Sequence, residues 1–345
     1  MAWLLSAGLS RFGLLDSLEL QGYDLLVWKG ESAPPPEELI VVDFDDATVE
    51  KLNAFPIPRA LLAEIVEKIG AGTPDLIGLD VLLDKRRDPA DDERLARTLA
   101  RAGNVVLAEV FATDQLPPSQ PLPEFRDVAL DAAFVNLPMD RDGFIRRTFL
   151  WMRARDYEGL AFPVVLASNF LQQPLQPGRP GSYRLGTIEI PSDDAAPNTA
   201  LIGNWSRVKK VTVLQVLASG FNPKVFAGKI VIVGQSSSAG KDQYQTPAFR
   251  FFGVAGQRRT SGAEIHAAAL VTLLRGQAPR VLDARTQWAL NWLCAWLVVV
   301  LVVALRPAYG AAAVAVGVFA TYGLAQWLMT QQHVWMKFIA SPTPP

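Results

Sequence analysis

The stretch LIVVDF at residues 39–44 decides the fold. It is a short apolar run that ends in acids, which is typical of a parallel strand that is buried on both faces. A helical pattern with one apolar face follows at residues 58–72, and a second apolar strand at 75–81. A helix at 93–102 and a third strand at 104–110 complete a β-α-β-α-β series with short connections. This series predicts a parallel sheet covered by helices.

The rest of the soluble region is less regular. A turn around Asp142-Gly143 separates two predicted strands, and Pro and Gly predict a linker or surface loop at residues 172–182. Other expected elements are a helix at 162–171, short antiparallel strands near 187–190 and 200–203, a strand at 229–234 and a helix from 261. The expected fold class is α/β, with a mixed, largely parallel sheet covered by helices and followed by a transmembrane helical hairpin.

Two uncharged apolar runs, at residues 288–305 and 308–329, predict that hairpin. Each holds about the 20 residues that a helix needs to cross a hydrocarbon core, and a helix pairs every backbone polar group there. The alternative is a pair of core helices in a soluble protein, which the lack of charge and the helix-ending Pro307 disfavour. The expected membrane-interface residues are Trp288, Trp292, Trp296, Arg306 and Trp327.

These patterns divide the chain into four parts. Residues 1–17 are a short apolar segment, interrupted by Arg11, that we expect to contact the membrane; a core helix and the remains of an anchor are the alternatives. Residues 18–282 form the α/β domain, residues 286–330 hold the two transmembrane helices, and residues 331–345 are a C-terminal tail.

Composition excludes several classes of function. The net charge is −1, from 33 basic and 34 acidic residues, and no basic stripe suggests a nucleic-acid partner. Cys294 is the only cysteine and lies in the first apolar run, which excludes a disulfide within the chain and a cysteine zinc site. Only His266 and His333 are present, so a histidine-rich metal site is excluded too. We expect no cofactor.

Acidic side chains that follow the first two predicted strands form the first candidate ligand site. These are Asp43, Asp45, Asp46, Asp80 and Asp84. If the two strands are parallel neighbours, the acids converge at the carboxyl edge of the sheet, where open α/β sheets bind ligands and where oxygen ligands suit Mg²⁺ or Ca²⁺. The structural alternative is that Asp45 and Asp46 cap turns or helices and that Asp80 pairs with Arg59 or Lys85.

The loop GQSSSAGKDQ, which starts at Gly234, is the second candidate. Backbone amides and Lys241 could face an anion. The loop fails the P-loop pattern, because five residues separate its glycines and Asp242 replaces the hydroxyl residue. A small-anion site, a partner contact and a structural loop remain open. His266, early in a predicted helix, lacks a recognisable nucleophile nearby in the sequence, so a fixed hydrogen bond under this loop is favoured over general-base catalysis. The turn at residues 136–147 could be a binding rim or a set of ion pairs.

An ordered series of motifs resembles a known family. The motifs are ELQGYDLLV, LIVVDFDDATVEKL, IPRALLAEIVEKI, PDLIGLDVLLD, DDERLARTLARAGNVVLA, VNLPMDRDGFIRRTFL, GKIVIVGQSSSAGKDQYQTP and GAEIHAAALVTLLRGQ. They span about residues 18–282 and resemble CHASE2, an extracytoplasmic sensory domain of bacterial membrane receptors. The resemblance implies an inner-membrane protein with its soluble domain in the periplasm. Family members usually also have a full N-terminal anchor, a third membrane helix and a cytoplasmic output domain, and none of these is recognisable in this sequence.

Three functions follow from this combination. We favour a non-enzymatic accessory or linking subunit of a larger membrane complex, with other membrane-protein subunits as partners. The alternative is a sensory module that binds a small periplasmic ligand and signals through a separate partner. A metal-dependent hydrolase that uses the acids is the least favoured.

Overall fold

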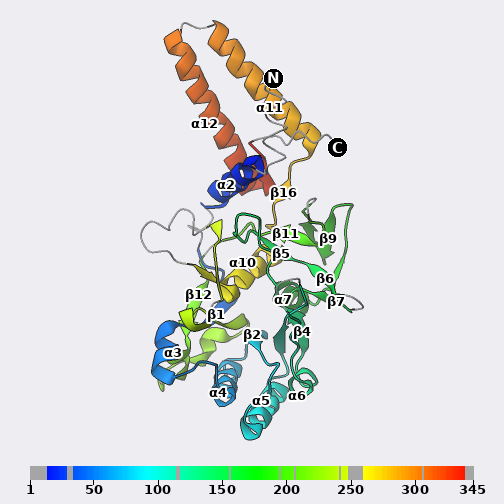
Figure 1. Cartoon of the computed structure of the whole chain (residues 1–345), viewed down its shortest axis with the longest axis vertical. Coiled ribbons are helices and arrows are strands. Elements are labelled where there is room, and N and C mark those ends of the chain that lie inside the picture. Colours follow the sequence, from blue (N-terminus) through cyan, green and yellow to red (C-terminus); the bar gives the residue numbers. More distant parts are fainter. Residues whose placement is uncertain are drawn as a thin grey trace. The chain divides into compact units, whose positions relative to one another are not determined.

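The structure is a computed structural model that describes residues 14–28, 34–113, 117–154, 157–193, 196–205, 207–240, 242–247, 259–304 and 307–338. The chain forms two compact units. One comprises Glu31–Ala278, and the other comprises Met1–Gly30 together with Pro279–Pro345. Figure 1 shows the elements of both units and labels many of them.

A six-stranded sheet forms the centre of the unit Glu31–Ala278. Every neighbouring pair of its strands is parallel, as the β-α-β-α-β series predicts. In spatial order the strands are β12 (Lys209–Thr212), β1 (Leu39–Phe44), β13 (Ile230–Gln235), β2 (Leu76–Leu82), β3 (Val105–Glu109) and β4 (Asp131–Phe134). The sequence did not predict β12. The sequence left open whether β1 and β2 are neighbours, and in the structure β13 lies between them.

Helices cover both faces of this sheet, because alternate strand residues point to opposite sides. Leu39 and Val41 of β1 share one core with α7 (Phe162–Leu171) and α10 (Gly262–Leu274). Ile40 and Val42 share the other core with helices from the opposite face. Those helices are α4 (Arg59–Gly70), α5 (Pro89–Ala102) and α8 (Val213–Leu217). The short helices of this unit are α3 (Asp46–Leu52), α6 (Pro123–Arg126), η2 (Pro223–Phe226) and η3 (Ser238–Gly240).

Outside the central sheet, this unit contains short antiparallel strand pairings. They are β5 (Arg147–Phe149) with β11 (Thr199–Leu201), β6 (Trp151–Ala154) with β7 (Tyr157–Leu160), β14 (Gln243–Tyr244) with β15 (Thr260–Ser261), and β8 (Leu175–Pro177) and β10 (Ile188–Pro191) on either side of β9 (Ser182–Leu185). The predicted linker at 172–182 therefore contains a strand. Its Pro and Gly form the turn before β9, where Gly181 has a φ of 78°.

The second unit contains the apolar hairpin. Its helices are α11 (Ala284–Ala304) and α12 (Pro307–Gln332), and both are long and apolar enough to cross a membrane. Helix α11 begins four residues before the predicted 288, and α12 extends beyond both ends of the predicted 308–329. Leu305 and Arg306 lie outside the described residues. Trp292, Trp296 and Trp327 are exposed on these helices.

The base of the hairpin is closed within that unit. Strand β16 (Arg280–Val281), before the hairpin, pairs in parallel with β17 (Val334–Trp335), after it. The side-chain amide of Gln287 on α11 donates to the backbone carbonyl of Lys337 at 2.6 Å and accepts from the Lys337 backbone N–H at 2.9 Å. Helix α2 (Leu14–Trp28) joins this base through Gln326, whose amide donates to the Leu26 carbonyl at 3.1 Å. The first 13 residues of the predicted N-terminal segment lie outside the described residues.

Candidate functional site

The carboxyl ends of β1, β13 and β2 place two aspartates and a glycine in one row. Asp43 of β1 pairs in register with Gly234 of β13. A Cβ placed on Gly234 would lie 3.6 Å from the Cβ of Asp80 on β2 and only 2.4 Å from the Cβ of Ala263. Because Gly234 has no side chain, the first turn of α10 fits between the two acids. Val41 packs in the core that α10 shares, so strand alternation turns Asp43 towards the same helix.

Asp43 is held from two sides. Its carboxylate accepts hydrogen bonds from the backbone N–H of Ser236 at 3.0 Å and from the Ser236 hydroxyl at 2.6 Å. The Lys210 ammonium lies 3.6 Å from Asp43 and 2.8 Å from Glu264 of α10. Burial raises the pKa of Asp43 although Ser236 and Lys210 act to lower it. Burial acts to raise the pKa of Glu264 too, but Lys210 and Ser261 outweigh it and lower that pKa.

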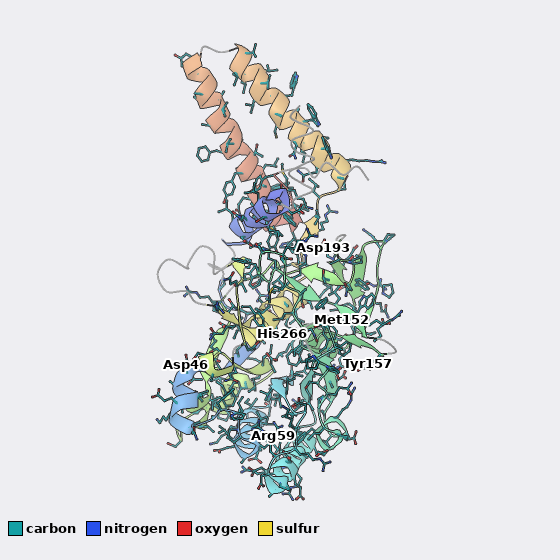
Figure 2. All side chains as sticks on the ribbon, in the orientation of Figure 1. Asp46, Arg59, Met152, Tyr157, Asp193 and His266 are labelled. Carbon is teal, nitrogen blue, oxygen red and sulfur yellow. The ribbon has the colours of Figure 1, made fainter. Side chains whose placement is uncertain are left out.

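Asp45 and Asp46 make local structural contacts. Asp45 is the N-cap of α3 and accepts from the Thr48 N–H at 2.9 Å. Asp46, labelled in Figure 2, accepts from the N–H and the hydroxyl of Ser238 at 2.8 and 2.9 Å. These bonds tie the loop after β13 to the start of α3. Asp45 therefore has the capping role considered for both acids, whereas Asp46 bonds to a distant loop, and the role of both in ligand binding stays a prediction.

Asp80 and Asp242 form a different arrangement. The Oδ2 atom of Asp80 is buried and has no hydrogen-bond partner. The Gly262 backbone N–H donates to the backbone carbonyl of Asp242 at 3.3 Å, and Tyr244 and Gly262 both act to lower the pKa of the Asp242 carboxyl. Burial raises the pKa of both carboxyls, and the charge of Asp242 raises that of Asp80 further. Burial and the two nearby acids also raise the pKa of Tyr244. Arg59, which the sequence offered as a partner of Asp80, instead pairs with Asp92 at 3.3 Å.

His266 is buried on α10, one turn beyond Ala263 (Figure 2). Its ring donates a hydrogen bond to the backbone carbonyl of Val135, and its Nδ1 atom has no partner. The Phe162 ring packs against it edge-on at 5.5 Å between centroids. Burial lowers the pKa of His266 to about 4. The fixed hydrogen bond is therefore present, but its acceptor follows β4 and does not belong to the loop after Gly234, because the helix has turned towards α7.

Lys241 lies outside the described residues. Among the residues that the structure describes, no three or more His, Cys, Asp or Glu side chains form a group that could hold a metal ion.

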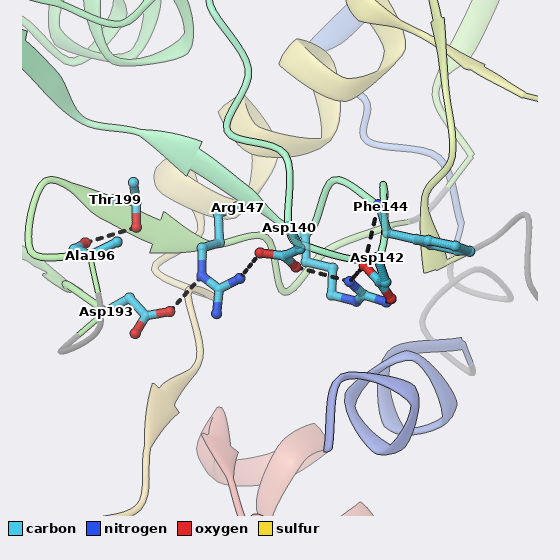
Figure 3. A network of polar contacts seen from close by, with 8 residues as sticks. Asp140, Asp142, Phe144, Arg147, Asp193, Ala196 and Thr199 are labelled. Atoms are coloured by element: carbon cyan, nitrogen blue, oxygen red, sulfur yellow. Dashed lines mark hydrogen bonds and ion pairs between the residues drawn. The ribbon is translucent and has the colours of Figure 1, made fainter. Parts of the chain in front are cut away.

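The turn at residues 136–147 carries a buried ion-pair network, drawn in Figure 3. Arg146 is fully buried and contacts Asp140 at 2.9 Å and Asp142 at 2.8 Å. Arg147 pairs with Asp140 and, at 2.5 Å, with Asp193. The sequence left open whether this turn is a binding rim or a set of ion pairs, and the structure shows that the ion pairs are present.

Sequence reasoning missed Lys210 and Tyr244. Lys210 lies on β12, and no local pattern shows that this strand pairs with β1 and brings its ammonium to Asp43. Tyr244 lies on the two-residue strand β14, which is too short to leave a periodic signal. The available hint was that Tyr244 follows Asp242 by two residues, the spacing that puts strand side chains on one face.

Comparison with known proteins identifies the family. The family model for the CHASE2 domain matches residues 1–305. The chain therefore belongs to the CHASE2 domain family, a family of extracytoplasmic sensory domains rather than of catalytic ones. No curated protein and no solved structure gives a significant match.

Proposed function

We propose that this chain is a membrane-anchored sensory module whose α/β domain takes up a ligand at the carboxyl edge of its parallel sheet. The row of Asp43, Gly234 and Asp80 carries the proposal, because it places two carboxyl groups at the edge of the sheet where α/β sheets bind ligands. Membership of a sensory family supports sensing more than the linking-subunit role that the sequence analysis favoured. A catalytic role for the acids has no support, and we propose none.

The soluble domain is then periplasmic and the hairpin lies in the bacterial inner membrane. The β16–β17 pairing supports this topology, because it holds the start and the end of the hairpin together on one side. Arg306, between the two helices, is then on the cytoplasmic side, as the positive-inside tendency prefers.

Two reporter fusions test this topology. Alkaline phosphatase fused after Pro345 should be active, and a fluorescent protein that folds only in the cytoplasm should be dark at the same site. Inserted after Arg306, both reporters should behave in the opposite way. Cytoplasmic fluorescence from the fusion after Pro345 would refute the periplasmic placement.

A partner subunit in the membrane receives the signal in this scheme. Pure linking, without sensing, is the second candidate, and the apolar residues that α11 and α12 expose, such as Val303 and Phe319, favour contacts with membrane neighbours. Gly310 and Gly317, two of the small residues that could pack a partner helix, lie instead against Val302 and Val298 of α11. This favours their use within the hairpin.

A ligand screen at fixed pH separates the two candidates. The full-length protein in nanodiscs is heated with small amines, amino acids, organic acids and sugars. A sensor should show a rise in Tm that saturates with one class of compound. The rise should weaken in Asp242→Asn and persist in Asp91→Asn, a half-buried residue of α5 on the opposite face of the sheet from α10. If no compound acts, if the Tm does not change with pH through Asp80 and Asp242, and if a stoichiometric membrane protein co-purifies in mild detergent, linking is the better description.

A further inference from the structure

Asp80 and Asp242 lie against the same turn of helix. A Cβ placed on Gly262 would be 2.5 Å from the Asp242 Oδ2 atom. A Cβ on Gly234 would be 3.6 Å from the Asp80 Oδ2 atom and 2.4 Å from Ala263. Gly262 and Ala263 are consecutive residues in the first turn of α10. Two glycines thus leave the room in which two carboxyl groups approach the beginning of one helix.

The described surroundings provide these two acids with no cationic partner. The charged groups nearby are Asp43 on β1, Lys210 on β12 and Glu264 on α10, and Lys210 is already shared between the other two. From β14, the neutral Tyr244 phenol donates to Asp242. The titratable group further along α10 is His266, whose ring bonds to the Val135 carbonyl. Within the described residues, Asp80 forms no ion pair, and its Oδ2 atom has no hydrogen bond.

Two carboxylates in such a site cannot both ionise without a large penalty. Burial removes the water that would solvate each charge, and each charge opposes the other. The N-terminal dipole of α10 favours one negative charge at this place but compensates only about half a charge. A single proton leaves one carboxylate, whose ionised form Tyr244 and Gly262 favour, and one neutral carboxylic acid.

We infer that Asp80 and Asp242 together bind one proton and that this proton is the ligand to which the domain responds, so that the module senses the pH outside the cytoplasm. The inference rests on the proposed sensory function and names the ligand of that same site. Release of the proton changes the pair from one negative charge to two. The repulsion then acts on β14, which begins directly after Asp242, and on the first turn of α10.

The position of α10 in the chain connects the acid pair to the membrane helices. The helix ends at Leu274, and the second unit of the chain begins at Pro279. It is therefore the last helix before the segment that leads to β16 and the hairpin. A shift of its first turn is transmitted along the backbone towards the membrane helices.

The direction of the pH effect follows from the raised pKa of each carboxyl. A carboxyl group whose pKa is higher in the folded state stabilises the fold at low pH and loses that contribution as pH rises through the folded-state pKa. The Tm of the protein should therefore fall as pH increases over this range.

Thermal unfolding of the full-length protein in nanodiscs between pH 4.5 and 9 tests the inference. We expect the wild-type Tm to fall by about 5 °C or more on the alkaline limb. Asp80→Asn, which mimics the protonated acid, should remove most of this fall. Asp242→Asn should do the same, and the double variant should add little because the two groups titrate as one pair. The control Asp91→Asn should keep the wild-type profile.

A spectroscopic measurement gives a readout that does not depend on stability. The infrared difference spectrum between acid and alkaline pH should contain the band of a buried carboxylic acid, and Asp80→Asn should lose it. The inference is wrong if both Asn variants keep the wild-type pH profile and the band. It is also wrong if Mg²⁺ or Ca²⁺ restores the Tm at alkaline pH in wild type but not in Asp80→Asn, because the pair then binds a metal ion. A third outcome is that a small compound stabilises the protein at fixed pH while Asp80→Asn keeps the wild-type pH profile. This result would support the sensory function but refute the proton as its ligand.

Discussion

The carboxylate of Asp43 accepts two hydrogen bonds from Ser236, one from the backbone N–H at 3.0 Å and one from the hydroxyl at 2.6 Å. The two residues lie at the ends of neighbouring strands and are 193 positions apart in the chain. The contact therefore fixes the loop after β13 against the end of β1, and it does so at a buried charge.

Removal of this hydroxyl gives the first prediction. Ser236→Ala should lower the free energy of unfolding by about 1.5–3 kcal/mol, the usual range for a hydrogen bond to a charged group. Ser238→Ala is the matched control, because its hydroxyl makes the same kind of bond to the exposed Asp46 and should matter less. Urea unfolding of the full-length protein in detergent measures both. Equal losses for the two variants would contradict the role given to Asp43.

The second prediction concerns the buried network in the turn at residues 136–147. Arg146→Met should destabilise the protein by about 3–5 kcal/mol, because it leaves Asp140 and Asp142 buried without this guanidinium. Arg153→Met removes an exposed ion pair with Glu158 and should change stability by no more than about 1 kcal/mol. The same unfolding experiment compares them, and a small effect of Arg146→Met would show that the network contributes little.

The sequence predicted the helices and strands whose ends are set by neighbouring residues, but not the order of the strands in the sheet. The helix expected at residues 162–171 has the same ends in α7, because its apolar run is bounded by Pro163 at the start and polar residues at the end. The strand at residues 39–44 is β1 for the same reason. The insertion of β13 between β1 and β2 was not predictable, because strand order depends on contacts between distant segments.

The sequence likewise predicted only part of the candidate site. Parallel strands bring Asp43 and Asp80 to one edge, and the sequence predicted that much. The partners of these acids come from elsewhere: Ser236 from a loop that the sequence related to an anion site, and Lys210 from an unpredicted strand. The sequence therefore indicated which acids gather at the edge but not which of them lacks a counter-charge.

Gly234 gives the third prediction. Gly234→Ala would place a Cβ 2.4 Å from the Cβ of Ala263, so α10 has to move away from the sheet. We expect a loss of about 1–3 kcal/mol in the free energy of unfolding. Gly70→Ala is the control, because nothing lies within 4 Å of its added Cβ, and alanine in a helix should be neutral or stabilise by up to about 1 kcal/mol. A loss in both variants would argue against close packing as the cause.

His266 gives the fourth prediction, with a pH dependence opposite to that of the acid pair. Its pKa falls from 6.5 to about 4 on folding, so the unfolded chain takes up the proton first as pH decreases. The contribution of neutral His266 is fully present above pH 6.5 and declines by up to about 3 kcal/mol as pH falls towards 4. His266→Asn should flatten this acid limb in thermal unfolding. His333→Asn should change it less, because that ring is only partly buried. An unchanged acid limb in His266→Asn would contradict the assignment.

The hairpin gives the last prediction, which separates packing within the chain from docking of a partner. A Cβ on Gly317 of α12 would lie 2.7 Å from a methyl carbon of Val298 on α11, whereas nothing lies within 4 Å of one on Gly323. Small residues let membrane helices approach closely, so Gly317→Leu should separate the two helices and destabilise the hairpin by about 1–3 kcal/mol, and Gly323→Leu should not. Thermal unfolding of the purified protein in detergent measures this loss without any partner present. If Gly317→Leu leaves the purified protein stable yet abolishes co-purification of a membrane protein, Gly317 serves a partner helix and the linking role gains its strongest support.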